Sequence, residues 1–406
     1  MPRDFTKLWL GQAVSRFGSG ITGSALPLAA LLVLGASPAQ MGLLAALGAA
    51  PVLLVGLFAG VWVDRVRRRP LMVWADLGRA GFLASIPAAW LLGGLRFEQL
   101  LLVAALVGVL TVLFGVAYQS FVPELVGRRR ILAANSRLAT VDALAEITTP
   151  GLAGLLVQAV GAPMAILLDA LSFVASAASV ALVRTQERAP APKTEAAGVR
   201  RELLEGLRVV GRSRLLRPIA AYAATREFFG NFIGVLYALF ALRDLGLDPV
   251  LLGITIGVGG VSNLAGAAAV GPVTRRFGVG PTMLGAVAVG SLSAFLIPLA
   301  GGPVLLGFAL LCASQAFDAI HPLYEVNALS VRQTATPDHL LGRVNASMHV
   351  LEGALAPVGA LVGGLLGDMI GTRETLFVAA FGIAASALWL LGSPLAALRE
   401  APAPPA

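Results

Sequence analysis

The chain has 406 residues, of which 57% are hydrophobic and only 13% are charged, whereas an average soluble domain carries about 25% charged residues. No Asp, Glu, Lys or Arg occurs from Phe17 to Val63, a run about twice the ~20 residues that cross a bilayer core. This composition excludes an ordinary soluble fold and predicts an all-α integral membrane protein, because a chain in hydrocarbon must satisfy its backbone hydrogen bonds within each segment.

The net charge of +8 does not indicate a nucleic-acid partner, because the basic residues lie between apolar segments, where they set membrane topology. The chain has three His and one Cys, Cys312, without the spacing of a zinc site. It also lacks a phosphate-binding loop and any recognisable catalytic set. We therefore expect no enzyme activity, no cofactor and no metal. A cleavable signal peptide is also not expected, because the first apolar segment is too long.

Twelve apolar segments are separated by charged or Gly/Pro-rich breaks, and each is long enough to form one transmembrane helix. Their approximate ranges are 8–34, 39–62, 71–94, 98–119, 136–159, 162–183, 216–241, 249–273, 280–300, 303–325, 343–369 and 373–396. We expect two six-helix bundles, residues 1–183 and 216–406.

The distribution of basic residues predicts the orientation. Of the 30, 24 lie in the two tails, the even-numbered loops and the central segment. Three lie inside helices, and the odd-numbered loops hold only Arg96, Arg243 and Arg373. Because basic loops stay in the cytoplasm, both termini are predicted to be cytoplasmic, in a bacterial inner membrane.

The central segment, 184–215, is the one long polar interval. It opens with an Ala- and Pro-rich stretch from Ala189 to Gly198, and from Arg200 to Arg214 its pattern predicts an amphipathic basic helix. Such a helix is expected to lie on the inner membrane surface, attracted by anionic headgroups. The segment is interpreted as a cytoplasmic linker between the bundles.

The two halves resemble each other. An offset of 210 residues aligns Asn135 with Asn345 and brings Asp142 onto Glu352, and an offset of 211 brings Gly60 onto Gly271. Internal duplication of this kind is common in transporters.

The most specific motif is GVWVDRVRRR, residues 60–69, between the second and third segments. A glycine is followed by Asp-Arg and then by two basic residues: Gly60, Asp64, Arg65, Arg68 and Arg69. This pattern resembles the major facilitator superfamily. Gly60 would let helices approach closely, and Asp64 could meet a helix N-terminus and nearby arginines in one conformation only. The motif is interpreted as a cytoplasmic gate; in the second half Arg275 replaces the aspartate.

Further stretches resemble the macrolide-efflux and siderophore-export type of drug:proton antiporter in this superfamily: FTKLWLGQAVSRFG at the N-terminus, ADLGRA, FVPELV with LAAN, LLDALSF and LLGRVNAS. The resemblance implies proton-driven efflux. Two features depart from the pattern. Gly18 is followed by Ser19 and not by an acid, and the helix-breaking antiporter-like element TPGLAG keeps Pro150, Gly151 and Gly154 but has Thr149 in a glycine position. An arginine that many other drug antiporters carry in the fourth segment is absent from 98–119.

Charged residues inside apolar segments are costly and need a partner, a cavity or a proton. Buried acids can take up a proton on one side and release it on the other. Asp142 and Glu352, which the repeat matches and which are expected to face a cavity, are the first candidates for proton coupling or substrate binding. The full set of candidates is Asp142, Glu146, Glu227, His349, Glu352 and Arg16.

Other polar residues in the segments are interpreted as structural. Asp76 and Arg79 are expected to form a gate or packing pair, and Asp169 and Asp318 to have packing roles. His321 is placed near the cytoplasmic end of the tenth segment and is not expected to bind a ligand.

The sequence thus predicts a monomeric secondary transporter that exports small amphiphilic compounds (a drug, macrolide or siderophore) in exchange for protons. Alternating access would occur around a cavity walled by Phe, Tyr and Trp with a few charges. One alternative is a facilitator that imports a metabolite or moves lysolipid, and another is a non-transporting receptor or scaffold.

Overall fold

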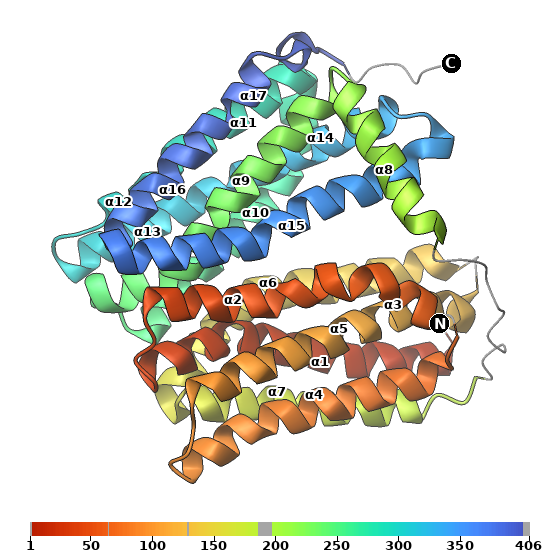
Figure 1. Ribbon diagram of the computed structural model, residues 1–406, viewed down its shortest axis with the longest axis vertical. Coiled ribbons are helices and arrows are strands. Elements are labelled where there is room, and N and C mark those ends of the chain that lie inside the picture. Colours follow the sequence, from red (N-terminus) through yellow and green to blue (C-terminus); the bar gives the residue numbers. More distant parts are fainter. Residues whose placement is uncertain (1, 64, 128–129, 186–196, 401–406) are drawn as a thin grey trace. The chain divides into compact units, whose positions relative to one another are not determined.

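The computed structural model describes residues 2–63, 65–127, 130–185 and 197–400 (Figure 1). In these residues the regular structure is entirely helical, which confirms the predicted fold class. The chain forms two compact units. The first consists of Met1–Ser37, Leu43–Ala196 and Asp248–Gly253, and the second of Pro38–Gly42, Ala197–Leu247 and Ile254–Ala406.

The first unit is a bundle of long helices. In it α1 packs against α6 and α7, and α4 packs against α5 and α7. The helices of this half of the chain are α1 (Arg3–Leu32), α2 (Pro38–Leu54), α3 (Gly56–Val63), α4 (Arg68–Leu91), α5 (Phe97–Val126), α6 (Ile131–Val160) and α7 (Ala162–Ala181).

In the second unit α9 packs against α15 and α16, and α11 packs against α14 and α16. A π-helical turn, η2 (Phe240–Asp244), and two 3₁₀ turns, η3 (Phe317–Ile320) and η4 (Pro394–Ala397), adjoin its helices. The helices of this half are α8 (Ala197–Arg212), α9 (Leu216–Leu239), α10 (Pro249–Phe277), α11 (Val279–Ala294), α12 (Leu296–Leu299), α13 (Val304–Ala316), α14 (His321–Thr334), α15 (Asp338–Ile370), α16 (Thr372–Ser386) and α17 (Leu388–Leu391).

Each of the twelve predicted segments corresponds to one helix or to consecutive helices. Among the described residues, eight helices are both long and apolar enough to cross a bilayer. The helices α1, α4 and α9 have 30, 24 and 24 residues but carry charged side chains, which lower their mean hydropathy. The remaining segment, 39–62, is divided at Val55 into α2 and α3.

Two predicted segments end too early. The segment 98–119 continues as α5 to Val126, and the segment 303–325 continues through η3 and α14 to Thr334. Polar side chains ended the apolar windows there, but a helix needs only its own backbone hydrogen bonds to continue. As a result, His321 lies near the middle of the span Val304–Thr334 and not at its end, as the sequence had indicated.

Small residues bring α1 and α7 into close contact. Gly18 packs directly over the side chains of Ser172 and Asp169, and Gly11 packs over Ser179. In addition, Gln12 Nε2 donates a 2.9 Å hydrogen bond to the Ser176 Oγ. In a membrane, where apolar burial gives little drive for helix association, close packing and such hydrogen bonds hold the helices together.

The helix expected in the central segment is α8, and it packs against α15. Gly206 lies against the backbone of Arg343, and Arg343 Nη1 forms a 2.9 Å ion pair with Glu205. Val210 belongs to a buried apolar cluster that includes Leu216. One side of the helix thus contacts protein, whereas the sequence indicated only a membrane surface. Residues 189–196 of the Ala/Pro-rich stretch lie outside the described residues.

The close approach of α1 and α7 yields a stability prediction. A Gly18→Val substitution places a branched side chain where Ser172 and Asp169 already lie, so we expect it to destabilise the protein by about 2 kcal/mol, as overpacking typically does. Gly23→Val is the control, because no atom lies within 4 Å of a Cβ added at Gly23. Thermal unfolding in detergent measures both, and equal melting temperatures for the two variants would contradict the packing model.

Candidate functional site

The arginine motif lies between α3 and the start of α4. Arg68 Nη1 is 3.3 Å from Glu124 Oε2 near the end of α5, and Arg69 donates a hydrogen bond to the carbonyl oxygen of Ala181 at the end of α7. Arg65 is exposed in the turn after α3. The motif arginines therefore connect the ends of three helices of the first unit.

Two motif residues cannot be placed in the same way. Asp64 lies outside the described residues, and of Gly60 only the backbone, in α3, is described. The gate interpretation, which depends on the Asp64 carboxylate, stays a prediction.

Arg16 of α1 and Asp142 of α6 are brought together. The Arg16 Nε lies 2.8 Å from Asp142 Oδ1, and the two side chains are 60% and 49% exposed. This ion pair is therefore open to its surroundings and not buried in the packing of the two helices. Glu146, one turn farther along α6, is also exposed.

Pro150 was expected to break its helix, and this expectation is wrong. The helix α6 runs without interruption from Ile131 to Val160, with Pro150 inside it. Proline removes a single N–H donor, and membrane helices tolerate that loss. Gly151 and Gly154 are likewise helical, and Thr149, whose hydroxyl donates to the Ala145 carbonyl oxygen at 2.7 Å, packs over Gly20 of α1.

The interior of the first unit holds a buried charged cluster. Arg79 forms an ion pair with Asp76 on the same helix, and all but 5% of Arg79 and the whole of Asp76 are buried. The Arg79 guanidinium also lies 4.5 Å from the ring centre of Phe114 and 4.1 Å from that of Phe173. Both distances are typical of cation–π contacts.

Asp169 of α7 extends this cluster. It is 1% exposed, accepts a 2.9 Å hydrogen bond from the Ser172 hydroxyl and is close enough to interact electrostatically with Arg79. The sequence predicted the pair Asp76–Arg79 but treated Asp169 separately. The available signal was that two apolar segments carry charged residues that need partners: Asp76 and Arg79 in 71–94, and Asp169 alone in 162–183.

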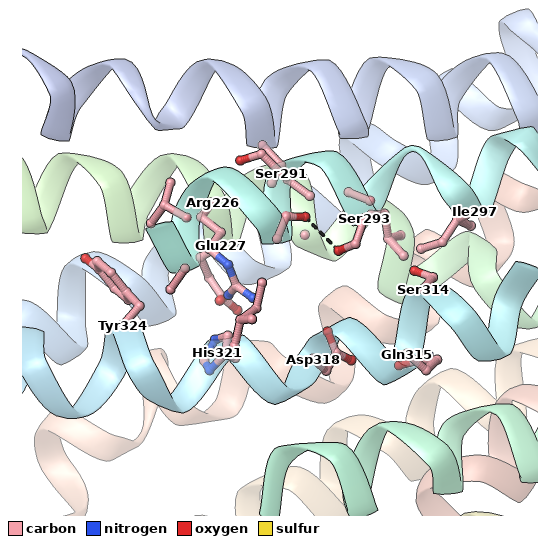
Figure 2. A pocket seen from close by; sticks show the side chains of 18 of the residues that line it. Arg226, Glu227, Ser291, Ser293, Ile297, Ser314, Gln315, Asp318, His321 and Tyr324 are labelled. Atoms are coloured by element: carbon pink, nitrogen blue, oxygen red, sulfur yellow. Dashed lines mark hydrogen bonds between the residues drawn. The ribbon is translucent and has the colours of Figure 1, made fainter. Parts of the chain in front are cut away.

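The second unit contains a cavity of about 410 Å³, whose lining residues come from α9, α11, α12, α13, η3, α14 and α16. Figure 2 shows Arg226 and Glu227 of α9 projecting into it, with His321 facing them and Asp318 farther along the same span. The other labelled lining residues are Ser291, Ser293, Ile297, Ser314, Gln315 and Tyr324.

Acids outnumber bases in and around this cavity. Glu227 accepts a 3.0 Å hydrogen bond from Asn231 Nδ2. Glu325 Oε1 lies 3.7 Å from His321 Nε2. Arg226 is the common electrostatic partner of Asp318, His321 and Glu325, and no carboxylate of the described residues lies within 4.0 Å of its guanidinium. Two acids, Glu227 and Asp318, and one guanidinium, that of Arg226, thus line the cavity together with His321, and Glu325 beside it also interacts with Arg332.

The cavity differs from the one expected in two respects. Its wall includes Tyr222 and Tyr324, but among the described residues no Phe or Trp lines it. Hydroxyl, amide and charged groups take their place. In addition, Asp318 and His321, interpreted from sequence as structural, line the cavity.

The remaining candidates lie on α15. His349 is exposed on this helix. Glu352 is helical, but its side chain lies outside the described residues. Of the six residues proposed for coupling or binding, the structure therefore places Glu227 in the described cavity and pairs Arg16 with Asp142.

Comparison with known proteins supports a transporter family. The family model described as Major Facilitator Superfamily matches residues 8–360. The multidrug efflux pump Tap of Mycolicibacterium fortuitum is 31% identical over 376 residues, which cover 88% of each chain. Macrolide efflux protein A of Streptococcus pyogenes is 23% identical over 91% of each chain.

Solved structures agree with this result at the level of the fold. The crystal structure of the nucleoside transporter NupG superposes with a TM-score of 0.77 at 12% identity, covering 96% of this chain and 98% of that one. A bacterial homologue of the iron transporter ferroportin in its inward-facing state gives a TM-score of 0.74 at 18% identity, with 96% and 98% coverage. On the family match and the similarity to Tap, this multi-pass membrane protein belongs to the major facilitator superfamily.

Proposed function

We propose that the protein exports amphiphilic drugs, by alternating access and in exchange for protons. The observation that carries this proposal is the cavity around Arg226, Glu227 and Asp318. Charged side chains placed inside an apolar span are expensive, and here they line a space that a small molecule can enter. The similarity to multidrug and macrolide efflux pumps over about nine-tenths of the chain supports the outward direction.

The charges of the cavity favour a substrate that carries a cationic group. Glu227 and Asp318 line the cavity, and Glu325 lies beside His321 at its edge. Glu325 also interacts with Arg332, and Arg226 is the one guanidinium in the lining beside Glu227 and Asp318. A drug cation would therefore find a net negative site, while Ile297, Val287 and the tyrosine rings offer apolar contact. A macrolide amine is one group of this kind.

Proton coupling is proposed for Asp142 in the first unit and for the acids of the cavity in the second. Asp142 is exposed and paired with Arg16, so protonation would exchange an ion pair for a neutral acid and a free guanidinium. In the cavity, a cationic substrate and a proton would compete for the same carboxylates, which links drug release to proton uptake. Glu146, His349 and Glu352 remain further candidates for coupling, and the motif from Gly60 to Arg69 for the cytoplasmic gate.

The direct test is efflux from everted membrane vesicles or from loaded cells. We expect a fluorescent cationic drug to be expelled when a proton gradient is present and to equilibrate when an uncoupler collapses the gradient. Cells that lack the gene are the control. Efflux that continues at full rate after uncoupling would contradict proton coupling, and absence of drug efflux with an intact gradient would contradict export.

A substitution in the first unit tests coupling separately from binding. Asp142→Asn cannot exchange a proton, so we expect roughly a tenfold loss of gradient-driven efflux. Drug binding by the purified protein should be nearly unchanged. The exposed ion pair between Asp142 and Arg16 contributes little to the stability of the folded protein, so its loss should leave the fold intact. Glu98→Gln, in the first turn of α5, is the matched control. Wild-type efflux by Asp142→Asn at all proton gradients would exclude Asp142 from coupling.

A substitution in the cavity tests the charge preference. Asp318→Asn keeps the shape of the side chain and removes one negative charge, so we expect affinity for a cationic drug to fall roughly tenfold. Affinity for an uncharged analogue should stay within about twofold of wild type. Arg226→Gln removes a positive charge and should therefore raise the affinity for the cationic drug. Binding titrations of the purified protein measure these effects, with Asp338→Asn, in the first turn of α15, as the control. Equal losses for cationic and neutral drugs would show that the site selects by shape.

A further inference from the structure

Tyr118 of α5 carries a hydroxyl group to which the proposed transport function gives no role. The hydroxyl oxygen is buried, and among the described residues it has no hydrogen-bond partner. Leaving a buried hydroxyl unpaired is unfavourable, unless the group is paired at another stage of the transport cycle.

Tyr118 lies close to the open ion pair of the first unit. It interacts electrostatically with both Arg16 and Asp142, whose side chains are 2.8 Å apart. The helix α5 packs against both α1 and α6, which carry these two residues. A phenol oxygen can accept a hydrogen bond from a guanidinium as well as donate one. Tyr118 is therefore placed to receive Arg16 when that side chain leaves Asp142.

The ring of Tyr118 is held in place by neighbouring side chains. It stacks on Phe114, one turn earlier on α5, with the ring centres 5.9 Å apart and an interplanar angle of 18°. The Phe114 ring in turn contacts the Arg79 guanidinium, which lies 4.5 Å from the ring centre. Arg79 belongs to the buried cluster with Asp76. The position of the Tyr118 ring is thus fixed by a part of the fold that is closed to the surroundings.

The charges around Arg16 favour a second partner for this side chain. Arg79 interacts electrostatically with Arg16, and two like charges repel each other. While Asp142 is ionised, it neutralises Arg16. Once Asp142 has bound a proton, Arg16 faces another guanidinium and needs an acceptor.

Other ionisable groups of the described helices that pack here could also influence this exchange. They are the acids of the buried cluster, Asp76 and Asp169, and two residues of α6, Arg137 near its start and Glu146 one turn beyond Asp142. The acids of the cluster are engaged with Arg79. Glu146 is exposed and is the competing acceptor for Arg16.

We propose that Tyr118 is a positioning residue for proton coupling, whose hydroxyl oxygen accepts a hydrogen bond from Arg16 when Asp142 becomes protonated. The phenol keeps its own proton in both states, and only the partner of Arg16 changes. The hydroxyl thereby stabilises the protonated state of Asp142 and not the ionised state, in which Arg16 stays with the carboxylate. The inference rests on the proposed role of Asp142 in proton coupling.

The test compares the wild-type protein with Tyr118→Phe, which removes only the hydroxyl group. Drug efflux from proteoliposomes is measured at a series of pH values with a constant pH difference across the membrane. Efflux should decline as the pH rises and Asp142 loses its proton. Without the hydroxyl, protonated Asp142 is less favoured, so we expect the pH of half-maximal efflux to fall by about one unit, a tenfold lower proton affinity.

Thermal unfolding separates this role from a purely structural one. The melting temperature of Tyr118→Phe should not fall, because the hydroxyl that it removes has no partner while Arg16 is paired with Asp142. Ser120→Ala, which also removes a hydroxyl from α5, is the control and should keep the wild-type pH of half-maximal efflux. A lower melting temperature of Tyr118→Phe with an unchanged pH profile would reduce the hydroxyl to a packing role and overturn the proposal.

A double-substitution cycle separates the role of Tyr118 from that of Asp142. If Tyr118 acts through the ion pair, Tyr118→Phe should have no further effect on efflux in an Asp142→Asn background. If Asp142→Asn impairs efflux but Tyr118→Phe leaves the pH profile unchanged, the role of Tyr118 alone is refuted. A shift caused by Glu146→Gln in place of Tyr118→Phe would assign Arg16 to Glu146. Wild-type behaviour of Asp142→Asn would instead refute coupling through Asp142, and this inference with it.

Discussion

Hydrocarbon offers no hydrogen bonds, so every polar group that this chain carries into the bilayer must find its partner inside the protein. The backbone meets this demand by being helical throughout the described spans. Several charged side chains gain partners by clustering. A lone charge near the bilayer centre costs about 3 kcal/mol on insertion scales, and Arg79 avoids this cost by lying among Asp76, Asp169 and two phenylalanine rings. The cluster connects α4, α5 and α7 of the first unit.

The need to find partners for charged groups inside the protein is met in two different ways, by a buried cluster and by accessible sites. The Asp76–Arg79–Asp169 cluster is closed, and its members are almost fully buried. Removing one partner from such a cluster typically costs about 3–5 kcal/mol, which suits a permanent structural role. The pair Arg16–Asp142 and the residues around Arg226 are instead open to the surroundings or to a cavity. A proton or a substrate can reach them without unfolding anything, as a transport cycle requires.

The sequence predicted the parts of the fold that follow from hydropathy. It was less accurate where a helix continues through polar residues. The charge-free run to Val63 indicated two spans, and the structure has α1 followed by α2 and α3. The apolar window stopped at residue 325 although α14 continues to Thr334, since polar residues such as Arg332 made the rest of the helix resemble a loop. That boundary error is why His321 was placed near a helix end and was not expected to bind a ligand, whereas Asp318 was interpreted as a packing residue on other grounds. Glu227 was predicted because it interrupts an otherwise apolar span. The clustering of Asp169 with Arg79 depends on how α4 and α7 pack, which hydropathy does not encode.

The 3₁₀ turn η3 also bears on how the cavity can respond to an occupant. It separates α13 from α14 at Phe317–Ile320, and short 3₁₀ stretches inside a helix often mark a bending point. Asp318 lies within this turn and His321 immediately after it. A molecule that binds both side chains would act directly on this flexible turn. The size of the bound molecule would therefore set the angle between α13 and α14.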